Sequence, residues 1–283
     1  MMTKTIYRIL MTAILVGLVS VGVAKPPSPV APWKIVVASD WHSAENGVLS
    51  KTPEAYENNQ AMERRRIAAT IIAKPDVVLI TGDTCSGHWG FAALKKAGLA
   101  QTKADVKKAI FKASKKTYAA LVSNFAASGI SKLLISTGDH ELGDNDWPVG
   151  SERAKSVPFY REGFARYVNF DDKGKWKWGE MVCGAPARPM GTIYQDTSFA
   201  LRHKNALIVT VDIFQWTGAN KKLSSQHGAV KADLEGEHLA WFKRVLAAGC
   251  ADPVVQFIIV QAHTPTLAPF RAVAGEIVQA FQR

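Results

Sequence analysis

Cysteine is scarce in this chain, which carries only Cys85, Cys183 and Cys250 among its 283 residues. Three thiols in this length exclude a small domain held together by a disulfide framework, and the sequence does not decide which two could pair in an oxidising compartment. Internal repeats and low-complexity tracts are also missing, and the composition is not that of a disordered or fibrous chain. The remaining class is a large globular domain, for which 283 residues can bury a substantial core.

The sequence also lacks an apolar run of the roughly 20 residues that a membrane-spanning helix prefers. The nearest candidate, Ile9 to Val23, is shorter, follows two basic residues and leads into Ala24. This order is typical of a secretory signal peptide over residues 1–24, cleaved after Ala24 and followed by a Pro-rich linker over residues 25–32. We therefore expect a secreted or periplasmic protein. The alternative is an uncleaved leader that serves as an N-terminal membrane anchor.

Acidic residues are fewer than basic ones, 24 against 35, and the formal net charge is +11. Removal of the leader takes away Lys4 and Arg8 and no acidic residue, which leaves +9. Such a charge attracts anionic partners at long range without specifying them. Phosphorylated small molecules, nucleic acid and an anionic envelope surface all fit it, and so does a basic surface with no partner. No recognised nucleic-acid-binding motif accompanies the charge, and nothing in the sequence indicates an oligomeric state.

Four short apolar runs that end in acidic or histidine residues are the most informative feature of the sequence. They are Ile35–Ser39 before Asp40-Trp41-His42, Val77–Thr81 before Gly82-Asp83, Leu133–Ile135 before the block Gly138-Asp139-His140-Glu141, and Phe257–Val260 before His263. Apolar runs of this length, bounded by turns, predict buried strands. Ligands of open α/β sheets bind just beyond the carboxyl ends of the strands. Carboxylates and imidazoles gathered there favour a divalent transition metal.

Helical patterns separate the predicted strands. Thr52-Pro53-Glu54 predicts a helix start with Thr as the N-cap, and Pro75 should stop this helix. Lys103–Ala127 has apolar residues at helical spacing, and its lysines form either a basic patch beside the site or a solvated face. Glu237–Ala248 predicts an amphipathic helix with Gly249 as its C-cap.

Two further features lie between the third and fourth predicted strands. The apolar runs Thr197–Arg202 and Ala206–Val211 predict a hairpin. Before it, residues 143–196 form a long connection rich in aromatic and arginine residues. A connection of this length is usually functional or has its own structure. We expect an insertion within one domain over residues 33–283, placed over the site to shape substrate choice, with its aromatic residues forming a satellite core.

In their order along the chain, the polar blocks resemble those of calcineurin-like metallophosphoesterases. The family's blocks read Asp-x-His, Gly-Asp, Gly-Asn-His-Asp/Glu, a lone His and Gly-His-x-His. The resemblance runs from about Ile35 to the C-terminus, and it implies an α/β fold of two packed mixed β-sheets flanked by helices, an α/β/β/α sandwich. It also implies two divalent metal ions (manganese, iron or zinc) and a phosphorylated small-molecule substrate. A phosphomonoester or phosphodiester would be hydrolysed by a metal-activated hydroxide.

The same resemblance implies a role for each block residue. The expected metal ligands are Asp40 and His42 on a first ion, Asp139 and His263 on a second, and Asp83 as the bridge between them. His140 is expected to face the phosphate without binding a metal, where it can stabilise charge or protonate the leaving oxygen. Glu141 is expected to orient its neighbours.

The chain departs from the family pattern in three places. Asp139 stands where Asn is usual, and Ser86 where the second block often has a second Asp. No Gly-His-x-His follows His263, so each metal would lack one ligand. Either the sequence is C-terminally incomplete, or water or another residue fills the gap. The leading hypothesis is an exported metallophosphoesterase. The alternative is a non-catalytic protein that binds a metal or phosphoanion on a degenerate scaffold, against which the retained His140 argues.

Overall fold

The computed structural model describes residues 30–42, 53–85, 87, 90–218 and 228–264. The chain divides into two units, and everything below concerns the second, Pro32–Arg283. The predicted signal peptide lies outside the described residues, as does Ser86. Among the helices that are described, none is both long and apolar enough to cross a membrane.

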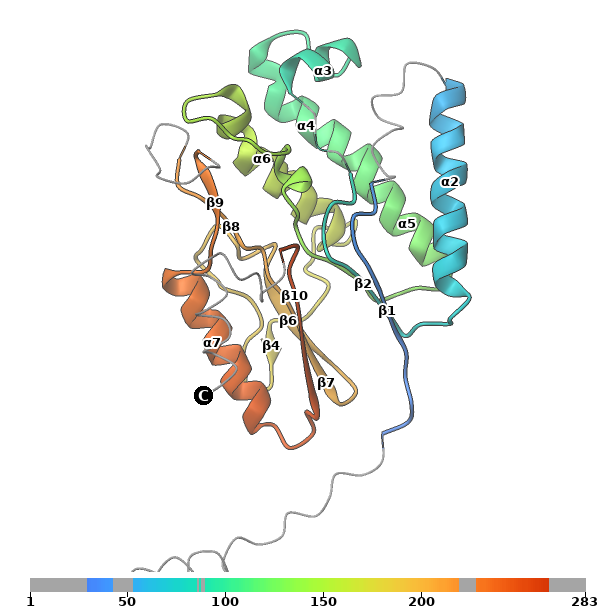
Figure 1. The fold of residues 1–283 in the computed structure, drawn as a ribbon, viewed down its shortest axis with the longest axis vertical. Helices are drawn as coiled ribbons and strands as arrows, with labels where there is room; N and C mark the ends of the chain where they lie inside the picture. The colour runs from blue at the N-terminus through green and yellow to red at the C-terminus, as the bar shows by residue number, and fades with distance from the viewer. Residues whose placement is uncertain (1–29, 43–52, 86, 88–89, 219–227, 265–283) are drawn as a thin grey trace, which may run out of the picture. The chain divides into compact units, whose positions relative to one another are not determined.

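Three parallel strands form the first sheet, in the order β1 (Ile35–Ala38), β2 (Val77–Ile80) and β3 (Leu133–Ile135). Parallel neighbours require crossover connections, which here are helical. The connecting helices are α2 (Pro53–Ile71) before β2, and α3 (Phe91–Lys96), α4 (Val106–Ser114) and α5 (Ala120–Ala127) before β3. The three carboxyl ends therefore meet at one edge of the sheet (Figure 1).

The second sheet is mixed and has the order β10 (Phe257–Gln261), β7 (Ala206–Thr210) and β6 (Phe199–His203). Strands β6 and β7 form the predicted antiparallel hairpin, and β10 runs parallel to β7. The smaller elements are the pairs β4 (Met181–Val182) with β5 (Ala185–Pro186) and β8 (Phe214–Trp216) with β9 (Val230–Ala232), and the helices α6 (Glu152–Val168) and α7 (Gly236–Ala251). The fourth predicted strand thus belongs to a different sheet from the first three.

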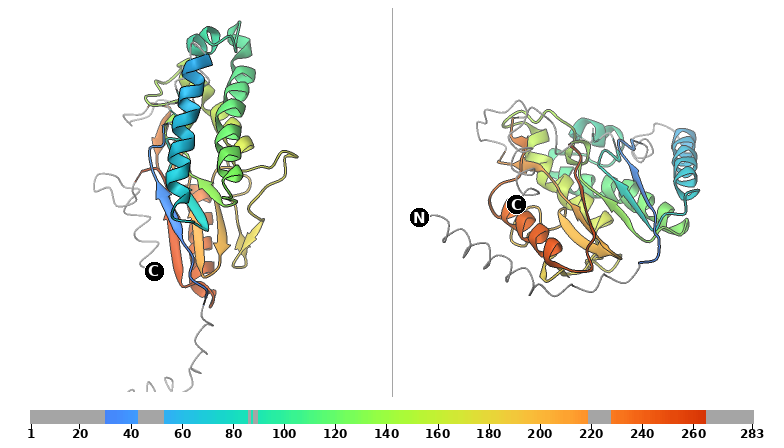
Figure 2. Two further views of the ribbon diagram at one scale, coloured as in Figure 1. Left: turned by 90° about the vertical axis from the view of Figure 1, so that its right-hand side faces the viewer. Right: turned by 60° about the horizontal axis from the view of Figure 1, so that its bottom comes forward.

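Alternating side chains on the strands show how the layers pack. Val77 and Leu79 of β2 pack with Ile208 of β7 in a core between the two sheets. Val78 and Ile80 point the other way, into a core shared with the helices α2, α4, α5 and α6. Figures 1 and 2 show α7 on the opposite side of the strands from α2 and α5. The arrangement is the expected α/β/β/α sandwich, and burial of each such side chain stabilises it by about 1.5–3 kcal/mol.

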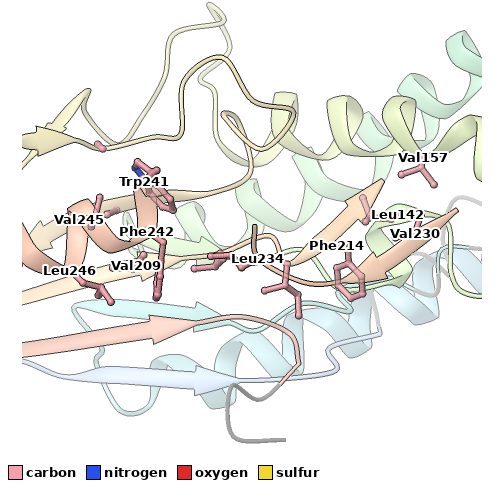
Figure 3. Packing of buried hydrophobic residues seen from close by; sticks show 14 of the residues in the cluster. Leu142, Val157, Val209, Phe214, Val230, Leu234, Trp241, Phe242, Val245 and Leu246 are labelled. Atoms are coloured by element: carbon pink, nitrogen blue, oxygen red, sulfur yellow. The ribbon is translucent and has the colours of Figure 1, made fainter. Parts of the chain in front are cut away.

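Helix α7 supplies the outer layer on the second sheet. Its residues Trp241, Phe242, Val245 and Leu246 pack in one core with Val209 of β7 (Figure 3). The prediction of Gly249 as the C-cap is wrong, because the helix continues to Ala251 and Asp252 is the C-cap. Gly249 instead marks close packing on β7, since a Cβ there would lie 2.4 Å from Leu207 Cδ2.

Two other predicted segments contain more structure than expected. The helical segment Lys103–Ala127 is divided by a π-helical turn, Lys115–Ala119, between α4 and α5. Lysines of α4 such as Lys107 and Lys112 are exposed, which supports a solvated face. In the connection 143–196, α6 packs against α4, and its Tyr160 and Phe164 belong to the main helical core. Helix α6 of the connection is therefore part of the main core.

Candidate metal centre

The six predicted site residues all follow the carboxyl ends of strands. Asp40 and His42 follow β1, Asp83 follows β2, Asp139 and His140 follow β3, and His263 follows β10. The site therefore lies where the ends of the two sheets meet.

Asp83 is the centre of the cluster. Its side chain is only 5% exposed, and its Oδ2 atom lies 3.3 Å from Nε2 of His263. Nε2 of His42 and Nε2 of His140 each lie 3.7 Å from the same oxygen. Asp40 is more peripheral, with its Oδ1 atom 4.0 Å from Nε2 of His42. One carboxylate oxygen thus faces three imidazoles delivered by three different strands.

His263 is fixed in the orientation that a metal ligand needs. Its Nδ1 lies 2.9 Å from the carbonyl oxygen of Thr81. A carbonyl can only accept, so Nδ1 carries a proton, and Nε2 is the ring nitrogen that is left to bind a metal. Nε2 faces Oδ1 of Asp139 at 3.2 Å. Such a hydrogen bond from the far ring nitrogen is the usual way that a protein orients a metal-binding histidine.

The backbone is unusual where the site residues lie. Asp40, His42 and Asp83 have φ values of 48°, 42° and 54°, in the left-handed region. For non-glycine residues this conformation costs about 1–3 kcal/mol each, and it tends to occur at functional sites. Gly138 permits the closest approach, because a Cβ there would lie 2.0 Å from Oδ1 of Asp83. The backbone of the loop after β3 therefore contacts the Asp83 side chain in the loop after β2.

Glu141 holds these two loops together. It is fully buried, and its Oε2 accepts hydrogen bonds from the backbone N–H groups of Asp83 at 2.8 Å and Gly138 at 2.7 Å. Its Oε1 accepts from the backbone N–H of Thr84 at 2.7 Å and from the Thr84 hydroxyl at 2.6 Å. The sequence predicts that Glu141 orients its neighbours, and the structure identifies them as the flanks of Asp83.

Two residues that the sequence reasoning did not select also reach the site. Asp144 places Oδ1 3.8 Å from Nε2 of His140, and Asn145 donates a side-chain hydrogen bond to Oδ2 of Asp139. Both lie in the first turn of the connection 143–196. The only sequence signal for them is their position directly after the third block.

The electrostatics of the cluster favour a cation. Burial, followed by the nearby charge of Glu141, raises the pKa of Asp83 to about 7. Burial alone would lower the pKa of His263, but the hydrogen bond to Asp139 and the charge of Asp83 outweigh it and raise that pKa to about 9. The charges of His263 and His140 lower the pKa of Asp83, but they do not outweigh its burial and the charges of Glu141 and Asp139. The set of imidazole and carboxylate donors fits a divalent metal such as manganese, iron or zinc.

Groups of three potential ligands lie within 4.8 Å of one another in this cluster. They are His42, Asp83 and His140; Asp40, Asp83 and His263; and Asp139, His140 and Asp144. Asp83 is shared by two of these groups. His140 also belongs to two, so its geometry is compatible with metal binding as well as with the expected role facing the phosphate.

None of the three cysteines belongs to the groups of candidate metal ligands found among the described residues. All are free thiols, and none forms a disulfide. Cys85 is buried two residues after Asp83, with its Sγ 3.3 Å from the hydroxyl of Tyr118. The structure thus gives Cys85 a packing position between the site and the helical core.

Comparison with known proteins identifies the class of protein. Residues 34–278 match the calcineurin-like phosphoesterase family, so the chain belongs to this family. It is a metal-dependent phosphoesterase, a hydrolase of phosphoric ester bonds that acts on phosphorylated small molecules. No curated protein sequence matches the chain. Among solved structures it is similar to a dimetal phosphatase from Danio rerio, with a TM-score of 0.47 and 11% identity over 89% of this chain and 78% of that one.

Proposed function

We propose that this protein is an exported phosphoesterase with two divalent metal ions bridged by Asp83. The observation that supports the bridge is the position of Asp83 Oδ2, 3.3–3.7 Å from Nε2 of three histidines. In this proposal Asp40 and His42 serve one ion, and Asp139 and His263 serve the other. When bound, two such ions would lower the pKa of water so that hydroxide forms near neutral pH, and would stabilise charge on phosphoryl oxygens.

The protein residues then perform the tasks of orientation and proton transfer. His263 is held by the carbonyl of Thr81, so that its Nε2 atom faces Asp83 and Asp139. The ring of His140 lies edge-on to that of His42, with ring centroids 4.8 Å apart. From there His140 can donate a proton or hydrogen bond to the leaving oxygen of a phosphomonoester or phosphodiester.

The test of activity compares two chromogenic substrates, 4-nitrophenyl phosphate and bis(4-nitrophenyl) phosphate, with added manganese. We expect hydrolysis of at least one, its loss after treatment with a chelator, and its recovery when manganese is restored. The Asp83→Asn variant, assayed beside the wild type, should be inactive under all three conditions. Binding of manganese and inorganic phosphate without turnover of either ester would instead support the alternative, a non-catalytic binder.

Export is the second part of the proposal and is based on residues 1–24 alone. If the leader is removed, N-terminal sequencing of the protein from the culture medium or periplasm should begin near Lys25. A protein recovered from the cytoplasm with Met1 still in place would contradict this part. The same result would leave the proposed chemistry unaffected, because every proposed ligand lies in the domain over residues 33–283.

A further inference from the structure

The chain segment after the third block folds back on the metal centre. A 3₁₀ turn, His140–Leu142, ends at Gly143, which has a left-handed φ of 96°. Asp144 is also left-handed, with a φ of 68°, and its backbone N–H donates to the carbonyl of Asp139 at 2.9 Å. This reversal brings the Asp144 carboxylate to 3.8 Å from Nε2 of His140, with only 14% of the side chain exposed.

Several contacts fix this loop. A Cβ on Gly143 would lie 2.6 Å from Cε2 of Tyr160, so the turn can pass the helical core only with glycine. The buried Trp147 donates its indole N–H to the carbonyl of Leu142 at 3.1 Å. Arg153 at the start of α6 donates to the carbonyls of Asn145 and Asp146, at 3.2 Å each. The position of Asp144 is therefore set by the fold on both sides.

Asp139 lies close to Asp144 as well as to His263. Oδ1 of Asp139 faces His263 at 3.2 Å, and its Oδ2 accepts from the amide of Asn145. One ligand atom each of Asp139, His140 and Asp144 lie within 4.8 Å of one another. Opposite ligands of a six-coordinate cation with bonds of about 2.0–2.1 Å are about 4 Å apart, so these side chains need only a small closure to share an ion.

We propose that Asp144 is a further ligand of the metal that Asp139 helps to hold. The inference rests on the proposed function, in which that ion is held by Asp83, Asp139 and His263. Three protein ligands leave positions open in a tetrahedral or octahedral shell. A carboxylate oxygen is a ligand that manganese prefers, and its charge offsets part of the charge on the cation. Asp144 would thus supply, from within the described domain, a ligand that the family pattern does not place there.

The test titrates manganese alone into the metal-free full-length protein by calorimetry. Asp144→Asn should weaken manganese binding at the affected site by about 10-fold or more, since loss of a supporting residue alone commonly costs 10–100-fold. Asn tolerates the left-handed backbone, so the loop should keep its shape. Asp146→Asn, at an exposed residue of the same loop, is the matched control and should bind within about twofold of the wild type.

Two further measurements keep the result interpretable. Asp144→Gly also permits the left-handed backbone and should weaken manganese binding like Asp144→Asn, while both metal-free variants should give the circular dichroism spectrum of the wild type. Unchanged manganese affinity in Asp144→Gly, which has no side-chain ligand atom, overturns the proposal even if turnover falls, because Asp144 would then act on His140 alone. If Asp83→Asn also keeps the affinity of the wild type, the proposed metal centre fails with it.

Discussion

Replacement of Glu141 by Gln tests how firmly the buried carboxylate holds the two loops of the metal centre. Glu141 accepts four short hydrogen bonds of 2.6–2.8 Å, three from backbone N–H groups and one from the Thr84 hydroxyl, and a longer one of 3.9 Å from Sγ of Cys85. All of its polar capacity is used, and the side chain has no access to solvent. In the variant an NH₂ group takes the place of one of the two oxygens, and it faces donors instead of accepting from them.

The expected loss of stability follows from the less costly of two amide orientations. In this orientation the NH₂ group of the introduced glutamine lies beside Thr84. The hydroxyl of Thr84 can turn to accept from it, and only the backbone N–H of Thr84 loses its partner. A buried N–H without a partner costs about 1–3 kcal/mol, and each bond that changes from a charged to a neutral acceptor weakens by about 1 kcal/mol. Relief of the repulsion between Glu141 and Asp83, which raises the pKa of Asp83, offsets part of this. We therefore expect the free energy of unfolding to fall by about 2–4 kcal/mol.

Urea denaturation of the protein in the presence of a chelator measures this change without a contribution from metal binding. The matched control is Glu162→Gln, whose carboxylate is 56% exposed and lies 3.3 Å from Nζ of Lys107. Exposed pairs of this kind contribute about 0–1 kcal/mol, so the control should change little. Equal stability of Glu141→Gln and Glu162→Gln would refute the reasoning, because the buried network would then contribute no more than a surface ion pair.

Three other changes test the roles within the site. His140→Ala should lower turnover by about 10²–10⁴-fold with unchanged metal content, and by less for substrates with acidic leaving groups; a parallel loss of metal would make His140 a ligand. Asp83→Asn should lower metal content in elemental analysis more than any other single substitution, because in the proposal only Asp83 binds both ions. Unchanged metal content would refute the assignment of Asp83 as the bridging ligand. In the metal-free protein the pKa of Asp83 rises from 3.8 to about 7 and that of His263 from 6.5 to about 9. Both raised values stabilise the fold at low pH, so stability should fall as the pH rises through this range. Melting temperatures measured with a chelator should show this slope, and Asp83→Asn should flatten it between about pH 4 and 7; an unchanged slope in the variant would rule out Asp83 as its source.

The sequence alone was sufficient to predict the strands and helices that have strong local patterns. Apolar runs between polar turns predicted β1, β2, β3 and β10. Every residue of β2 and β3 is buried as expected, whereas the edge strands β1 and β10 carry the exposed residues Val37 and Phe257. The pattern Thr52-Pro53-Glu54 likewise predicted the start of α2, which begins at Pro53, while Thr52 lies outside the described residues. Two apolar runs around His203-Lys204-Asn205 predicted the hairpin of β6 and β7. The identity of the family followed from the order of the polar blocks, and the match over residues 34–278 confirms it.

Tertiary structure decided what depends on contacts between distant segments. Glycine is a common residue at helix ends, yet α7 continues past Gly249. The glycine is needed there because a side chain would collide with Leu207 of β7. The sequence placed Glu141 beside the site, but its bonds to Thr84, 57 residues away, exist only in the folded chain. Asp144 had no signal of its own, since its approach to His140 results from two consecutive left-handed residues and from anchors on Trp147 and α6. The local pattern of apolar and polar residues indicates which residues are buried. The geometry of a site depends instead on how the helices and strands are positioned against one another.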